Sequence, residues 1–271
     1  MTVFIAALGA ILGSFLNVCI VRWPAGESVV RPRSRCPGCG HLIAWYDNIP
    51  VVSWVLRGAR CRHCAAPISL LYPTVELTTA ALWLGAWGAF GPTLTAVRVA
   101  IAATILLGIA VTDLRAYLIP DGFTVTGFLS ALAFAMVAFF VGAPGPFAGP
   151  WEALVGACAG AGLIAIIGWL GEVALGKEAM GQGDVTLMAF VGALVGPGRA
   201  ILTVMLAAVL ATVIFLGVVA PVGWLLARRR GEPYALPLVP FGVFLAPAGL
   251  VALLWGDAIV AWYVGTFFPT V

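Results

Sequence analysis

The chain has 271 residues, of which 62% are hydrophobic and 9% are charged, whereas about 25% of the residues of an ordinary soluble domain are charged. This composition excludes a water-soluble globular fold, and the long apolar runs exclude a disordered or collagen-like chain. The formal net charge of +3 is small, so the positions of the basic residues carry more information than their sum.

Seven segments are apolar over a length that can cross a bilayer, since a helix needs about 20 residues to span a hydrocarbon core of roughly 30 Å. In chain order they are Thr2–Val21, Thr74–Phe90, Thr93–Thr112, Phe123–Val141, Trp151–Leu175, Ala200–Ala227 and Phe241–Phe267. An eighth run, Val185–Val195, is short, and its length is equally typical of a re-entrant segment or a helix buried between others.

The distribution of basic residues decides whether this short run crosses the membrane. Seven arginines lie in the loop after the first apolar segment, and short loops rich in Lys and Arg stay on the cytoplasmic side. If Val185–Val195 also crosses, Arg115, Lys177 and the triplet Arg228–Arg230 face the cytoplasm as well. We therefore expect an all-α, polytopic membrane protein with about eight transmembrane helices. The first helix is expected to be retained, because no basic residue precedes its apolar core.

The only sizeable polar segment is a cytoplasmic insert, residues 22–72, between a first transmembrane helix (1–21) and a seven-helix transmembrane domain (73–271). The insert contains two Cys-x-x-Cys motifs, Cys36–Cys39 and Cys61–Cys64. Two such turns supply the four thiolates that a structural Zn²⁺ prefers, and so small an insert needs the folding energy of a metal. The sequence therefore predicts a zinc site formed by Cys36, Cys39, Cys61 and Cys64.

The sequence also permits other interpretations of these cysteines. His63 is an alternative ligand, because it lies within the second motif. Two disulfides or free thiols are the alternatives to a metal, but the reducing cytoplasm argues against stable disulfides. Cys19 and Cys158 lie within apolar segments and are interpreted as small core residues.

Three carboxylates lie at the predicted inner face, where ionisable groups beside a membrane span are functional candidates. Asp113 and Asp121 lie between the third and fourth segments, and Asp184 ends the motif Gly181-Gln-Gly183-Asp. Two carboxylates held together share a proton, and such a pair can hydrolyse an amide by general acid and base catalysis. We expect Asp113 and Asp184 to be catalytic, with Gly181 and Gly183 permitting close backbone approach and unusual dihedrals.

The helix ends suggest a role for each acid. Asp113 follows the C-terminus of a span, where the helix dipole disfavours negative charge, whereas Asp184 opens a span, where the dipole favours it. This comparison predicts an ionised Asp184 as the base and a protonated Asp113 as the acid. The alternative interpretation of Asp184 and Asp121 is a helix N-cap, and for Asp121 the cap is favoured.

Two other classes of function fit some of these features. Membrane carboxylates also serve as proton relays in ion-coupled transporters, although those sites usually lie near the midplane of repeated halves. A scaffold whose zinc insert docks the proteins of a larger assembly, with the acids as caps, is the third alternative. The basic insert is accounted for by orientation and by anionic lipid, so no nucleic-acid partner is expected.

Nearly the whole chain resembles the type IV prepilin peptidases, membrane aspartic proteases that are also N-methyltransferases. The resemblance is carried by these segments, in order: Gly13-Ser-Phe-Leu-Asn-Val18, Cys36-Pro-Gly-Cys39, Trp45-Tyr-Asp-Asn-Ile-Pro50, Ser53-Trp54, Leu56-Arg-Gly58, Cys61-Arg-His-Cys64, Tyr72-Pro73, Val75-Glu-Leu77, Asp113 to Asp121, Met180-Gly-Gln-Gly-Asp184 and Pro240-Phe-Gly242. Two positions depart from the family pattern: Thr186 and Leu71 replace residues that are usually Lys and Arg.

The resemblance implies a catalytic pair at Asp113 and Asp184 and a tetrathiolate zinc insert. It implies cleavage of the basic leader of prepilins, or of type II secretion pseudopilins, at the cytoplasmic face of the bacterial inner membrane. It also implies methylation of the new amino terminus by S-adenosylmethionine. For the methyl donor, Gly13, Asn17, Glu76 and the insert are the places we would examine.

Overall fold

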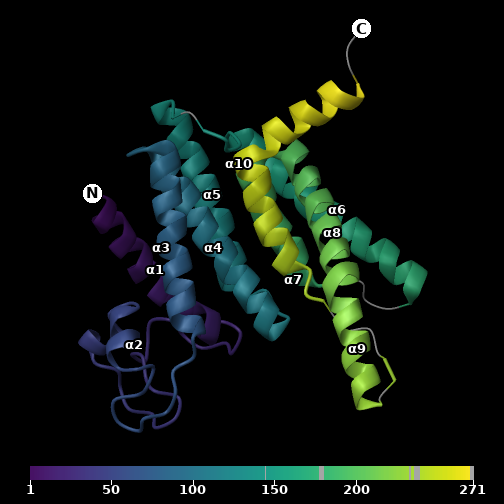
Figure 1. Ribbon diagram of the computed structural model, residues 1–271. Helices are drawn as coiled ribbons and strands as arrows, with labels where there is room; N and C mark the ends of the chain where they lie inside the picture. The colour runs from purple at the N-terminus through teal and green to yellow at the C-terminus, as the bar shows by residue number, and fades with distance from the viewer. Residues whose placement is uncertain (144, 177–179, 232, 235–238, 269–271) are drawn as a thin grey trace. The chain divides into compact units, whose positions relative to one another are not determined.

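The structure is a computed structural model that describes residues 1–143, 145–176, 180–231, 233–234 and 239–268 (Figure 1). The regular secondary structure of the described chain is helical, with two isolated β-bridges and no strand, which confirms the prediction of an all-α fold. Lys177, expected on the inner side, lies outside the described residues.

Six of the described helices are long and apolar enough to cross a membrane. They are α1 (Thr2–Arg22), α4 (Leu94–Ala116), α5 (Asp121–Val141), α6 (Pro150–Ala174, within a helix that continues to Leu175), the continuous helix Pro197–Arg230, and α10 (Gly242–Phe267). The two remaining predicted spans are also helices, α3 (Leu71–Phe90) and α7 (Gln182–Val195). The described helices therefore confirm a multi-pass architecture, whereas the count of eight crossings stays a prediction.

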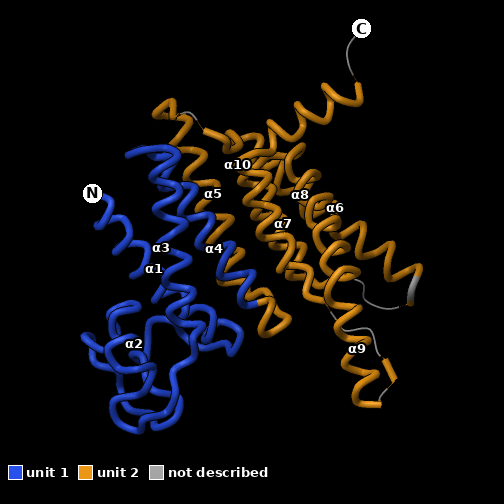
Figure 2. The backbone as a smooth tube through the Cα atoms, in the orientation of Figure 1, with its two compact units in different colours: residues 1–112 blue, residues 113–271 orange. Residues whose placement is uncertain are grey.

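The chain forms two compact units, residues 1–112 and 113–271 (Figure 2). Helix α4 belongs to both, because the boundary falls between Thr112 and Asp113, near its C-terminal end. This boundary differs from the three-part division expected from the sequence (1–21, 22–72 and 73–271), which stays a prediction.

In the first unit, α1 packs closely against α3. Two glycines one helical turn apart make this possible, since a Cβ at Gly9 would lie 2.8 Å from the Ala80 Cα, and one at Gly13 would lie 2.7 Å from the Glu76 Cα. Small residues at this spacing are typical of packed membrane helices. The insert between α1 and α3 contains a short 3-10 helix, η1 (Trp45–Asn48), and a short α-helix, α2 (Val52–Leu56).

In the second unit, α7 is the central helix and contacts α5, α6, α8 and α10. Its 14 residues extend only about 21 Å at 1.5 Å per residue. Almost every residue from Leu187 to Val195 is buried, so this helix is short because it is covered by protein rather than by lipid. Its first turn carries Asp184, and packing around α7 therefore positions that acid.

The helix from Pro197 to Arg230 is unusually long, with 34 residues. It consists of α8 (Pro197–Ile214), a π-helical segment η2 (Phe215–Val219) and α9 (Ala220–Arg230). A single π-turn inside an α-helix adds one residue without ending the helix. The sequence predicted the apolar part of this helix but not its continuation to the arginine triplet.

Candidate functional site

The structure brings Asp113 and Asp184 together in the second unit. Asp113 lies in the last turn of α4, and Asp184 lies in the first turn of α7. The two carboxylates are close enough to interact electrostatically. Only 5% of Asp113 is exposed, and Asp184 is partly buried. A pair of acids, one buried and one partly buried, is therefore present where α4 ends and α7 begins.

The start of α10 contacts one member of this pair directly. The backbone N–H of Val243, the second residue of α10, donates to Oδ2 of Asp113 at 3.1 Å, and the Gly242 N–H also donates to this carboxylate. A Cβ at Gly242 would lie 2.7 Å from the same Oδ2 atom. Glycine is required here because any side chain would displace the carboxylate. Gly242, part of the segment Pro240-Phe-Gly242 that was singled out above only by resemblance, thus contributes to the site.

Ile119 fills the space between the glycines that approach the acids. A Cβ at Gly242 would lie 2.7 Å from the Ile119 Cδ1, and a Cβ at Gly183 would lie 2.9 Å from the Ile119 Cβ. Gly183 therefore permits the expected close approach. The expected unusual dihedrals are absent, since Gly181 has φ −78° and ψ 152°, and neither Gly181 nor Gly183 has a positive φ. Space rather than conformational freedom explains Gly183, whereas nothing in the structure explains Gly181, where a Cβ would come no nearer than 3.8 Å to the Asp184 Oδ2.

Two neighbouring residues have ordinary local roles. Asp121 is the first residue of α5 and is exposed. The N-cap of α5 is Pro120, so the prediction that Asp121 is the N-cap is wrong, but the helix dipole favours an acid in the first turn. Thr186, which stands where the family usually has Lys, donates its hydroxyl to the Gly183 carbonyl at 3.0 Å.

The four cysteines of the insert form a cluster in the first unit. Their sulfur atoms all lie within 4.8 Å of one another, and the Cys36 and Cys64 Sγ atoms are 3.8 Å apart. Tetrahedral zinc with Zn–S bonds of about 2.3 Å separates its sulfurs by about 3.8 Å. The cluster therefore fits a zinc ion. His63 is not a member of it and stacks instead on His41, with ring centroids 3.5 Å apart.

The two knuckles repeat one backbone pattern. The Cys36 N–H donates to the His41 carbonyl at 2.9 Å, and the Cys61 N–H donates to the Ala66 carbonyl at 2.9 Å. One isolated β-bridge flanks each knuckle, Arg35 with Leu42 and Arg60 with Pro67. Two equivalent turns present two thiols each, which is the arrangement expected from the spacing of the motifs.

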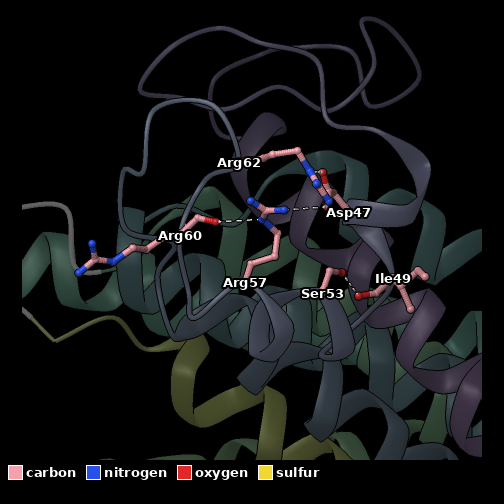
Figure 3. A network of polar contacts seen from close by, with 6 residues as sticks. All are labelled: Asp47, Ile49, Ser53, Arg57, Arg60 and Arg62. Atoms are coloured by element: carbon pink, nitrogen blue, oxygen red, sulfur yellow. Dashed lines mark hydrogen bonds and ion pairs between the residues drawn. The ribbon is translucent and has the colours of Figure 1, made fainter.

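A polar network joins η1 to the second knuckle (Figure 3). Arg62 donates to both oxygens of Asp47 at 2.7 Å, and an Arg57 nitrogen lies 3.5 Å from Oδ1 of Asp47. The hydrogen bonds from Arg62 lower the pKa of Asp47 below its ordinary value, and the positive charges of Arg62 and Arg57 act in the same direction. Asp47 thus fixes η1 beside Cys61 and Cys64.

The residues considered for the methyl donor lie in the contact between α1 and α3. Asn17 donates from Nδ2 to the Tyr72 carbonyl at 3.0 Å, and Glu76 accepts the Val51 N–H at 2.7 Å. Because Gly13 packs against the Glu76 backbone, all three residues are used to join helices. Their place in a methyl-donor site stays a prediction, and no step of methyl transfer is derived from them.

Glu76 also holds an unusual backbone turn. Val51 has φ 61° and ψ −51°, and the Val52 N–H donates to the Pro50 carbonyl at 2.5 Å. These features define a γ-turn of the rare, strained kind. A β-branched residue at positive φ is a genuine outlier, and the buried carboxylate of Glu76 compensates by accepting the N–H of the strained residue.

Comparisons with known proteins agree with this arrangement. The bacterial Peptidase A24 N-terminal domain matches residues 7–90, and the type IV leader peptidase family matches residues 100–216. Prepilin leader peptidase/N-methyltransferases are similar over most of the chain. The protein of Aeromonas hydrophila is 34% identical over 94% of this chain and 91% of its own length, and that of Pseudomonas aeruginosa is 35% identical with the same coverage. The protein of Myxococcus xanthus is 40% identical over 85% of this chain and 65% of its own length. No solved structure shows a significant match.

The fold and the site define a helical membrane protein with a paired-aspartate site in one unit and a four-cysteine insert in the other. The similarity to leader peptidases covers both units. The chain belongs to the type IV leader peptidase family.

Proposed function

We propose that this protein is a membrane aspartic peptidase that removes the basic leader of type IV prepilins or pseudopilins, with Asp113 and Asp184 as its catalytic residues. The observation that carries the proposal is the pairing of these two acids from separate helices, in a chain that belongs to the leader peptidase family. The relatives named above are prepilin leader peptidases.

The reaction needs one ionised and one protonated carboxyl group. The ionised carboxylate removes a proton from water while the water oxygen bonds to the scissile carbonyl carbon, and the protonated carboxyl gives its proton to the carbonyl oxygen. The resulting tetrahedral diol then breaks down. The carboxyl group that took the proton from water gives it to the amide nitrogen, and the other carboxylate takes a proton from one of the diol hydroxyls. The C–N bond then breaks, and the pair recovers its single shared proton.

The orientation of the substrate supports the assignment of the cytoplasmic face of the inner membrane. A precursor with one apolar span and a basic leader keeps the leader on the cytoplasmic side. Its scissile bond then lies at the depth proposed for the aspartate pair, where α4 ends and α7 begins.

The four cysteines Cys36, Cys39, Cys61 and Cys64 are proposed to hold a structural zinc ion. When bound, the ion supplies folding energy to an insert too small to bury a core of its own. The described contacts of Asp47 then fix η1 on the metal-bound knuckle.

We further propose that the protein methylates the new amino terminus of the mature pilin with S-adenosylmethionine. This part rests on the names of the relatives, which are peptidases and N-methyltransferases. Those names do not favour the alternatives of an ion-coupled transporter or an assembly scaffold.

The test is cleavage of a purified prepilin by the protein in liposomes, with the product's N-terminus determined by mass spectrometry. Asp113→Asn and Asp184→Asn should each abolish leader removal while the protein stays folded. Asp257→Asn is a matched control, because Asp257 is an exposed acid on α10 that pairs with Arg199. Adding S-adenosylmethionine should add one methyl group to the cleaved product. Cleavage that survives either of the two substitutions would contradict the assigned catalytic pair.

A further inference from the structure

The two acids differ in the number of backbone donors that contact them. Asp113 accepts the N–H groups of Gly242 and Val243 at the start of α10. Asp184 accepts one backbone N–H, that of Gly181. N–H donors directed at a carboxylate favour its ionised form. Because Asp113 has two such donors and Asp184 has one, the negative charge of the pair is more stable on Asp113.

Helix dipoles do not reverse this difference. Asp113 lies at the C-terminal end of its own helix α4, which is unfavourable for a negative charge, but it also lies at the N-terminal end of α10, which is favourable. Asp184 has the favourable end of α7 only. Hydrogen bonds to a charged group outweigh the dipole of one helix end by roughly two- to threefold. The additional direct donor to Asp113 therefore decides the comparison.

The other described ionisable groups near the pair are exposed. Near the pair these groups are Arg115 of α4, Tyr117 and Asp121. Helix α10 carries no ionisable residue before Asp257. In the described chain, Arg115 forms no ion pair with either acid. Among the described residues, the charge that acts on Asp184 is that of Asp113.

From this geometry we infer that the start of α10 holds Asp113 as the ionised general base, so that Asp184 is the protonated general acid. The inference rests on the proposed peptidase function and reverses the roles expected from the acids' own helices. Gly242 and Val243 are positioning residues: they act on the base through their backbone and do not touch the reacting atoms.

Removing one donor tests this assignment. Val243→Pro deletes the N–H that contacts Asp113, at a first-turn position where a helix tolerates proline. The measurement is the pH dependence of kcat/KM for leader cleavage. Its acid limb reports the first ionisation of the pair, and its basic limb reports the second. If Asp113 carries the charge, the acid limb moves upward by about one to two pH units.

Each other result has a defined meaning. Movement of the basic limb alone would show that Asp113 holds the proton, and an unchanged profile would show that the α10 donor does not act; either result overturns the inference. Val243→Ala is the matched control, because it shortens the same side chain but keeps the N–H, and its acid limb should stay at the wild-type pH whatever its rate.

If the Val243→Pro enzyme is inactive at every pH, a second measurement replaces the pH profile of cleavage. In protein labelled with carboxyl-¹³C aspartate, the two resonances are assigned with Asp113→Asn and Asp184→Asn and are titrated directly. The Asp113 resonance should change first as the pH rises in the wild type, and later in Val243→Pro; the opposite order overturns the inference. If wild-type protein does not cleave prepilin, or Asp113→Asn still does, it is the proposed function that fails.

Discussion

The backbones of Gly156 on α6 and Gly192 on α7 face each other in direct contact. A Cβ on either glycine would overlap the carbonyl oxygen of the other. Gly160, one turn further along α6, makes the same approach to the Met188 carbonyl. This contact fixes the position of α7 along α6, and it thereby fixes Asp184 at the start of α7.

Gly192→Ala should consequently reduce leader cleavage more than tenfold, because α7 must shift to accept the methyl group. Overpacking of this kind costs about 1–3 kcal/mol of stability. The measurements are cleavage rate and thermal unfolding in the same detergent. Gly162→Ala is the control on α6, since its Cβ would meet nothing within 4 Å; it should leave the rate unchanged and stabilise the helix slightly. Equal effects of the two substitutions would refute the role of this contact.

The cysteine cluster predicts a dependence of the insert on zinc. Cys39→Ser and Cys64→Ser should each lower the zinc content from one ion per chain to well below half, because a structural site needs all four ligands. Residues 22–72 should then become sensitive to limited proteolysis. Cys158→Ser should retain full zinc content, because Cys158 lies on α6 outside the cluster and is exposed, not a core residue as predicted. Stoichiometric zinc in Cys39→Ser would exclude the proposed ligand set.

Strong chelators extend this test to the wild-type chain. Removal of the metal should open the insert to protease while the helices of the second unit keep their resistance, since the four ligands all lie in the first unit. Addition of zinc should restore the original cleavage pattern. An insert that resists protease equally with and without metal would contradict a structural role for zinc.

The ion pairs of Asp47 predict a specific pH dependence. Asp47→Asn should destabilise the insert by about 1 kcal/mol, the upper value for an ion pair near the surface. Because the pKa of Asp47 is lowered in the folded state, its contribution is fully present above the unfolded value of about 3.9 and is lost only as the pH falls through the folded pKa. The difference between wild type and Asp47→Asn should therefore stay constant from pH 8 to pH 5.

The measurement is the protease resistance or unfolding of the zinc-loaded insert at each pH. Glu27→Gln provides a control, because Glu27 is an exposed acid of the same insert with no ion pair in the described chain. A stability difference that disappears between pH 7 and pH 5 would show that Asp47 is not held by Arg62.

The γ-turn at Val51 predicts that the glycine variant is more stable than the alanine variant, the reverse of the order in a helix. Both Val51→Gly and Val51→Ala remove the valine side chain, but only glycine adopts φ 61° without steric cost. Val51→Gly should be more stable than Val51→Ala by about 1 kcal/mol. At Val55, inside α2, the same pair should show the usual order, with alanine the more stable. Thermal unfolding of the four variants provides the comparison.

Much of the fold was predictable because each expected membrane-spanning helix can be recognised from its own apolar composition. The apolar runs gave the helices, and the spacing of Cys36, Cys39, Cys61 and Cys64 gave the cluster. The glycine pairs Gly9 with Gly13 and Gly156 with Gly160 also carried a signal that the sequence analysis did not use, since glycines four residues apart in an apolar helix indicate close packing. The central position of α7 has no such local signal, because burial by protein and burial by lipid select the same apolar residues.

The site was less predictable than the fold. Asp113 and Asp184 could be singled out as costly charges beside spans, but the environment of Asp113 depends on Val243, which follows it by 130 residues. The comparison of helix dipoles considered only α4 and α7, which carry the acids, and so it omitted the contribution of α10. The strained turn at Val51 was likewise unpredictable, because valine is among the residues least expected at positive φ.

The 34 residues from Pro197 to Arg230 measure about 51 Å along the helix axis, whereas the hydrocarbon core of a bilayer is only about 30 Å thick. About 20 Å of this rod must therefore stand among the headgroups and in the water beyond them, unless the axis tilts strongly. Its exposed end carries Arg228, Arg229 and Arg230, whose guanidinium groups can reach lipid phosphates. We therefore expect the three arginines to set how deeply the helix sits in the membrane.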